Sequence, residues 1–351
     1  MIMKTKRLSG IELLRLFAMF GIVLSHWGGH GSWQLDSDNT YLYNKVFLQF
    51  TQYLGEIGNC IFILITGYFC ANKTEISKEG LIRVVADVKV YAFIIWGAVV
   101  MLGLVPFTVM GGLKSILSIM YPNYWFVLPY LAVFILSPWI NQVLHHSSNK
   151  ALKYYFGIMI AIEMLLPLMK APTISSNVGL FVLLYSLGFM LRTKKISIFK
   201  KDKTPILLLS TGFMTAILSL IILDYVLPVF NLNIHLSMML IGRFSFLPVL
   251  SAIGLLLWFE RLNIVSPIIN RLAQSAFAVY LISENPNVYP WFWKLFFDNI
   301  EFYNTSYMIP IALLQAMVVM ASCIFIDMMY KKSKFFIKCF FYDKTLASPR
   351  E

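Results

Sequence analysis

Charged residues are scarce in this sequence. They account for 13% of its 351 residues, about half the share of a soluble globular chain. Hydrophobic residues make up 59%, and the mean hydropathy is +0.73. A chain this long and apolar cannot enclose its side chains in one core, so many segments must face lipid. No stretch is long or polar enough for a separate soluble domain, and residues 1–351 are predicted to form a single membrane-embedded domain.

Cysteine is also rare. The four cysteines lie in or beside apolar runs, and none has CxxC or other metal-like spacing: Cys60, Cys70, Cys323 and Cys339. Cysteines of this kind usually act as small buried hydrophobes. The sequence therefore predicts neither a disulfide framework nor a metal site.

Acidic residues are few compared with basic ones. The sequence has 17 Asp and Glu against 29 Lys and Arg, for a net charge of +12. In a soluble protein this excess would favour nucleic-acid binding. In a membrane protein, basic residues collect in cytoplasmic loops, which explains the excess without any nucleic-acid partner.

Apolar segments long enough to cross a bilayer recur along the whole chain. A spanning helix needs about 20 mostly apolar residues, and about ten such helices with short connections use the entire sequence. The predicted fold is an all-α, polytopic membrane bundle. Its spans are expected at about 11–28, 46–70, 84–105, 122–144, 155–170, 178–192, 205–224, 244–259, 272–286 and 307–330.

The basic residues predict the orientation of this bundle. With the N-terminus in the cytoplasm, 23 of the 29 Lys and Arg residues fall in cytoplasmic segments, as the positive-inside bias requires. An even number of spans then places both termini in the cytoplasm, and the expected location is the cell membrane. The densest basic loop runs from Lys194 to Lys203. It is either a solvated face or a contact with anionic lipid.

The first span carries two polar side chains that are costly in a membrane, Arg15 and His26. A charge at the bilayer centre costs at least about 2.5–3.5 kcal/mol on insertion scales, and such residues tend to be functional. Eleven residues are about three helical turns, so both project from nearly one face, about 16 Å apart. The orientation puts Arg15 toward the cytoplasm and His26 toward the outside. The structural alternative is that Arg15 pairs with Glu12 and His26 is a polar helix end.

His26 is a candidate general base, because histidine is the side chain best suited to move protons near neutral pH. His26 and His30 are spaced i,i+4, as in some metal sites. However, Gly28 and Gly29 are expected to end the helix between them, and no further ligand set is evident. Glu56, in the outer half of the second span, is a candidate to orient or pair with His26. Otherwise it is a boundary carboxylate.

Other charges fall near the two membrane surfaces. On the inner side, Arg83 and Lys89 flank the entry of the third span and are candidates to bind phosphates, to which Arg offers bidentate contacts. The positive-inside bias explains these two residues equally well. Four charges toward the outer side are expected to line a polar cavity there: Glu163, Asp224, Arg243 and Glu284.

Five segments in order resemble the membrane-bound acyltransferase-3 family. Its first span has an Arg, ten residues and then a His, with an acidic residue three positions before the Arg. These are Arg15, His26 and Glu12 here. The other similar segments are Phe62–Phe69, Asn123–Phe126, Tyr185–Gly188 and Ser275–Ile282. The resemblance covers most of the chain and the ten-span plan.

The resemblance implies a membrane-bound O-acyltransferase. Such an enzyme transfers an acyl group, usually acetyl, from cytoplasmic acyl-CoA to a hydroxyl of a cell-envelope glycan or lipid-linked sugar. Arg15, with Arg83 and Lys89, would hold the anionic donor. His26 would act as general base, and Glu56 would orient it. Acetyl-CoA or another acyl-CoA is the donor expected, and no metal is implied.

One position departs from the family pattern. Relatives often have a His directly after the late Tyr-Leu-Ile, where this chain has Ser283 followed by Glu284. This departure keeps open an inactive membrane assembly partner. A polysaccharide or lipid-linked sugar transporter also fits ten spans with interior charges, although the sequence has no internal repeat of the kind many transporters carry.

Overall fold

The structure is a computed structural model, and it describes residues 8–31, 33, 41–119, 124–169, 176–195, 197–230, 232, 237–297 and 299–346. Within these ranges the regular elements are helices, and no strand occurs. In chain order they are α1 (Ser9–Gly29), α2 (Leu42–Cys70), α3 (Lys78–Met101), α4 (Val109–Ile116), α5 (Val127–His146), α6 (Asn149–Ile160), η1 (Ala161–Leu165), α7 (Leu166–Leu168), α8 (Asn177–Thr193), η2 (Ser197–Lys200), α9 (Thr204–Ile221), η3 (Ile222–Val226), η4 (Leu227–Phe230), α10 (Ser237–Ile241), α11 (Phe246–Glu260), α12 (Pro267–Leu272), η5 (Ala273–Ser275), α13 (Ala276–Ser283), α14 (Tyr289–Phe296), η6 (Asn299–Phe302) and α15 (Met308–Leu346).

Eight helical segments of the described chain have the length and composition to cross a membrane. They are Ser9–Gly29, Leu42–Cys70, Lys78–Met101, Val127–His146, Asn149–Leu168, Thr204–Phe230, Ser237–Glu260 and Met308–Lys334. These segments match the first five predicted spans and the seventh, eighth and tenth. The predicted fold class, a polytopic helical membrane protein, is therefore confirmed.

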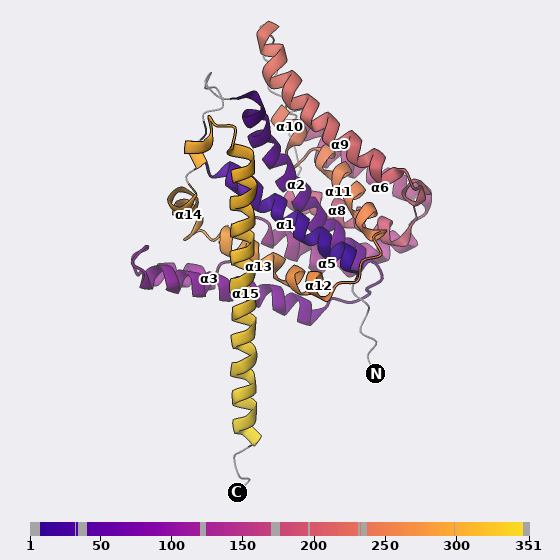
Figure 1. Cartoon of the computed structure of the whole chain (residues 1–351). Coiled ribbons are helices and arrows are strands. Elements are labelled where there is room, and N and C mark those ends of the chain that lie inside the picture. The colour runs from indigo at the N-terminus through magenta and orange to yellow at the C-terminus, as the bar shows by residue number, and fades with distance from the viewer. Residues whose placement is uncertain are drawn as a thin grey trace.

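The predicted sixth and ninth spans have helices shorter than these eight. α8, at 17 residues, is apolar but short, and the segment 272–286 is divided among α12, η5, α13 and the turn that follows. Two predicted span ends, residues 122–123 and Lys170, lie outside the described residues. In Figure 1 the last turns of α15 extend to the bottom of the view, beyond the rest of the bundle. The cytoplasmic location of both termini stays a prediction.

α1 lies in the interior of the bundle because small residues let α2 approach it closely. A Cβ added to Gly58 would lie 2.5 Å from the Ala18 carbonyl, and one added to Gly21 would lie 3.0 Å from the Leu54 carbonyl. Small residues at helix contacts are a main device of membrane bundles, where apolar area alone does not drive association. α2 then packs on α8 in the same way, since a Cβ on Gly67 would lie 2.1 Å from the Tyr185 carbonyl.

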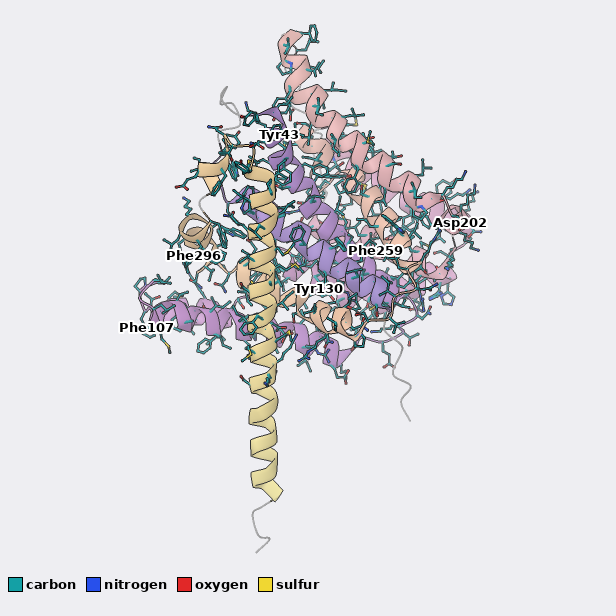
Figure 2. All side chains as sticks on the ribbon, viewed as in Figure 1. Tyr43, Phe107, Tyr130, Asp202, Phe259 and Phe296 are labelled. Atoms are coloured by element: carbon teal, nitrogen blue, oxygen red, sulfur yellow. The ribbon has the colours of Figure 1, made fainter. Side chains whose placement is uncertain are left out.

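The margin of the bundle is apolar and exposed. α3 and α15 extend from the rest of the molecule (Figure 1), and large hydrophobic side chains on them are open to the surroundings, as with Met101 and Phe325. Phe107 and Phe296 project at the edge of the molecule, whereas Tyr130 and Phe259 lie within its outline (Figure 2). An exposed apolar rim is what a lipid-facing surface requires. The polar residues of α1 point inward instead.

Candidate active site

A polar cavity of about 230 Å³ surrounds the C-terminal end of α1. Its chemically active lining residues are His26, His30, Glu56, Arg243 and Glu284. Of the four outer charges predicted to line such a cavity, Arg243 and Glu284 do so. The other two are held elsewhere. Glu163 accepts the Ser176 backbone N–H at 3.1 Å, and Asp224 accepts from Gln49 at 2.7 Å. Both sit in π-helical turns, η1 and η3.

Glu284 is the carboxylate that meets His26. Its Oε1 lies 3.1 Å from His26 Nδ1 and 3.1 Å from His30 Nε2. The contact with His26 is short but is not aligned as a hydrogen bond, whereas the contact with His30 is. α1 ends at Gly29, and His30 is its C-cap residue. The helix therefore ends between the two histidines, as Gly28 and Gly29 predict. One carboxylate thus joins both rings.

The loop after α13 is fixed in a way that sets the position of Glu284. Asn285 Nδ2 donates to the Tyr124 hydroxyl at 2.9 Å, and that hydroxyl donates to the Leu281 carbonyl at 2.9 Å. His30 is held from its other side, because its ring stacks on Tyr289 with centroids 4.8 Å apart. Ser283, the position that departs from the expected family pattern, is buried and does not line this cavity.

Glu56 faces the same cavity, but its carboxylate pairs with other residues. Its Oε1 lies 3.5 Å from Arg243 Nε, and its Oε2 accepts from Asn59 at 3.2 Å. The Arg243 guanidinium stacks on Trp125, 3.5 Å from the ring centroid. Within the described residues Glu56 therefore lies against Arg243 and not against His26, since the guanidinium offers its carboxylate a positively charged partner. A role for Glu56 in orienting the site stays a prediction.

A second cavity, of about 500 Å³, lies at the N-terminal half of α1 and contains Arg15. Arg83 from α3 and Lys331 from α15 also line it, and Asp87 is the carboxylate among its lining residues. Arg15 Nη1 lies 3.1 Å from Glu12 Oε2, so the Arg15–Glu12 pair that the sequence offers as an alternative is formed. Arg15 nevertheless lines the cavity. Lys89 is exposed on α3 and does not line this space.

A narrow space of about 30 Å³ lies between the two cavities. It shares Phe62, Phe126 and Phe277 with the inner cavity, and Ile22, Asn59 and Tyr280 with the outer cavity. Arg15 and His26 thus face two chambers that adjoin one constriction along α1. The constriction holds no more than about two water molecules.

Comparison with known proteins decides what this arrangement belongs to. A family model described as an acyltransferase domain matches residues 8–327. The chain belongs to the acyltransferase-3 family. No curated protein and no solved structure shows a significant match to it.

The segments that resemble the acyltransferase-3 family gather around these cavities. In this acyltransferase, Trp125 lies beneath Arg243 in the outer chamber, Tyr280 lines the constriction, and Thr66 lines the inner chamber. The backbone carbonyl of Tyr185 faces Gly67, where α8 packs on α2. Asn123, the first residue of one such segment, lies outside the described residues.

Two features of these chambers could not be predicted from the sequence: the contact of Glu284 with His26 and the place of Lys331 in the inner chamber. Glu284 is visible as an outer charge, but nothing in its spacing pairs it with His26, 258 residues away. Lys331 is counted among the cytoplasmic charges, and only the approach of α15 brings it to the inner chamber. There it lies 2.6 Å from Asp327, which also accepts from Tyr91 at 2.5 Å. Across the described residues, no group of three or more His, Cys, Asp or Glu is arranged to hold a metal ion.

Proposed function

We propose that this acyltransferase carries an acyl group, normally acetyl, from cytoplasmic acyl-CoA to a hydroxyl of a cell-envelope glycan or lipid-linked sugar at the cell membrane. The observation that carries the proposal is the row of chambers along α1. One chamber holds cationic side chains, and the other holds a histidine in contact with a carboxylate. The family supplies the reaction class, and the row of chambers suggests how two substrates on opposite sides would meet.

The inner chamber suits the phosphates of CoA. Arg15, Arg83 and Lys331 line it against one carboxylate, Asp87. Guanidinium groups bind phosphate oxygens bidentately, and their partners Glu12 and Asp327 would keep Arg15 and Lys331 in place. Lys89 would act only at the mouth, since it is exposed outside the chamber. The thin pantetheine arm would then extend past Phe62 and Phe277.

The outer chamber would perform the transfer. The Glu284 carboxylate beside Nδ1 would stabilise the imidazolium that forms when Nε2 of His26 accepts a proton. The acceptor O–H would lose its proton to Nε2 as its oxygen attacks the thioester carbonyl carbon. The C–O bond forms, the C–S bond breaks, and the thiolate sulfur takes the proton from His26. Glu56, held by Arg243 over Trp125, would shape the acceptor site.

The transporter alternative is weakened by the constriction. A sugar is far larger than the roughly two waters that the narrow space admits. An exporter would have to separate α1, α2, α5 and α13 around it. A pantetheine arm is narrower than a sugar ring, so it would need a smaller opening there.

The test combines two measurements on purified protein. Acetyl-CoA should raise the melting temperature, as any ligand of the folded state does, and release of free CoA should follow when an acceptor is added. His26→Ala should lower the transfer rate by about 10²–10⁴-fold, while His146→Ala, which changes an exposed histidine outside both chambers, should leave it unchanged. Mass spectrometry of envelope glycans from deleted and complemented strains should then identify the acyl mass.

The contrary outcome is equally clear. If His26→Ala and Arg15→Ala proteins insert normally and still transfer at the wild-type rate, the proposal is wrong. If both variants leave envelope acylation normal and only deletion abolishes it, the chain is an assembly partner instead.

A further inference from the structure

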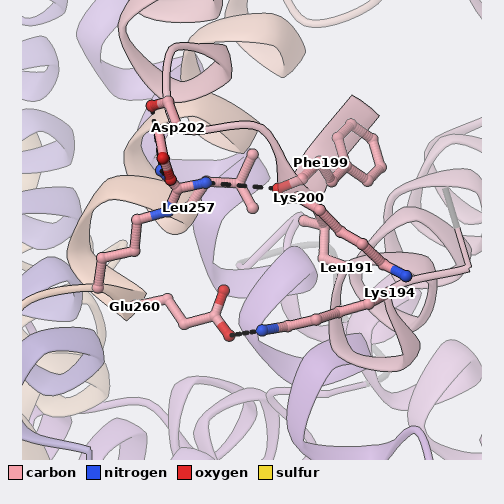
Figure 3. Close-up of a pocket in the computed structure, with 8 residues that line it drawn as sticks. Leu191, Lys194, Phe199, Lys200, Asp202, Leu257 and Glu260 are labelled. Atoms are coloured by element: carbon pink, nitrogen blue, oxygen red, sulfur yellow. Dashed lines mark hydrogen bonds and ion pairs between the residues drawn. The ribbon is translucent and has the colours of Figure 1, made fainter. Parts of the chain in front are cut away.

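A third cavity lies at the end of the bundle where α8 and α11 end and α9 begins. It has a volume of about 570 Å³. Its walls are Leu191, Phe199 and Leu257, and its charged lining residues are Lys194, Lys200, Asp202, Glu260 and Arg261 (Figure 3). These helix ends lie on the side where α1 begins, because Gly10 packs against the Phe259 carbonyl. The cavity shares no lining residue with either chamber of the transfer site, so it is a separate space.

The charges of this cavity are arranged in two layers. Glu260 lies deeper, where it accepts from Tyr68 at 2.8 Å and lies 3.8 Å from Lys194 Nζ. Arg261 donates to the carbonyls of Asp202 and Lys201, both at 3.0 Å, and so holds the loop that forms one wall. Among the described residues the Lys200 ammonium has no ion-pair partner. The lining thus holds three cations and two carboxylates over an apolar wall, and of these described residues Lys200 is the cation without a carboxylate partner.

Lys194 stands in a conformation that side chains rarely adopt. Its φ is +50° and its ψ is +31°, so it caps α8 in the left-handed region. Glycine normally occupies this position because it has no Cβ to clash. Its backbone N–H donates to the Leu191 carbonyl at the helix end, and its ammonium reaches the cavity beside Glu260 (Figure 3). A residue that adopts a strained backbone conformation and places its charge in a cavity is a candidate for function.

We infer that this cavity binds the headgroup of an anionic phospholipid of the cytoplasmic leaflet. It lies where membrane-crossing helices end, which is the depth of headgroup phosphates. The phosphodiester would lie between Lys194 and Lys200, and the glycerol and first acyl carbons would contact Leu191, Phe199 and Leu257. Lys201 and Lys203, exposed on the same loop, would add attraction to the anionic surface. Bound lipid would clamp the ends of α8, α9 and α11 together.

The test uses the full chain in neutral detergent, with melting temperature as the measurement. Dioctanoyl phosphatidylglycerol should raise the melting temperature more than dioctanoyl phosphatidylcholine does. Lys194→Gln with Lys200→Gln should weaken the phosphatidylglycerol response roughly thirtyfold in concentration. Lys150→Gln with Lys153→Gln, exposed on α6 with the same loss of charge, should keep it.

A second variant separates binding from folding. Lys194→Gly removes the left-handed strain, so without lipid it should unfold at the same or a higher temperature. It should nevertheless lose part of the phosphatidylglycerol response. The inference is overturned if the double pocket variant responds like wild type, if the α6 control loses the response equally, or if inorganic phosphate stabilises the protein as well as the lipid does.

Discussion

At the residue scale, the carboxylate that meets His26 is Glu284. Sequence position favours Glu56, which lies in the second span beside two glycines, whereas the structure puts Glu284 Oε1 3.1 Å from His26 Nδ1. Glu56 meets Arg243 instead. A buried histidine with one nitrogen against a carboxylate has its other nitrogen available as a base. The proposal therefore depends on Glu284 more than on Glu56.

Glu284→Gln should lower the transfer rate strongly. The amide removes the negative charge that would stabilise the imidazolium, so a loss of roughly 10²–10⁴-fold is expected in kcat. The KM for acetyl-CoA should change little, because Glu284 lies in the outer chamber. Glu56→Gln is the matched control and should act mainly through the acceptor KM. Equal kcat losses in the two variants would contradict this assignment.

At the scale of elements, the sequence predicts the helices well and their contacts poorly. Spans such as 11–28 and 307–330 are read from composition because lipid demands long apolar runs. The pairing of α2 with α8 is not readable, since it depends on Gly67 lying against a carbonyl 118 residues away in sequence. The site was predictable only in part for the same reason. Arg15 and His26 share one helix, whereas Glu284 lies directly after α13 and Lys331 lies on α15.

The close approach of α2 and α8 gives a prediction about stability. In Gly67→Ala the new Cβ would lie 2.1 Å from the Tyr185 carbonyl. A backbone atom cannot rotate away, so the helices must separate, at a cost of about 1–3 kcal/mol. The matched control is Gly97→Ala on α3, whose Cβ would meet nothing within 4 Å. It should be neutral or stabilise by about 0.5–1 kcal/mol. Thermal unfolding in detergent compares the two, and an equal loss in both would disprove the packing argument.

At the scale of the whole molecule, the acyltransferase has two chambers at opposite ends of a central helix and a constriction between them. The charge bias of the sequence predicts that the Arg15 end faces the cytoplasm. The cationic lining of that end agrees with a soluble, anionic donor. The histidine end would then face the side on which the proposed glycan acceptor lies. The predicted orientation of the chain and the proposed chemistry thus agree, although they rest on different residues.

The measurement that tests this account most directly uses sealed proteoliposomes sorted by orientation. Acetyl-CoA is supplied only on the side of the N-terminus, and a glycan acceptor only on the opposite side. Acylated glycan should form in this arrangement, and its formation should stop when the two substrates are exchanged. Arg15→Ala should raise the KM for acetyl-CoA, and His26→Ala should abolish turnover while acetyl-CoA still raises the melting temperature. Equal product with the substrates exchanged, or wild-type turnover by the His26 variant, would contradict the account.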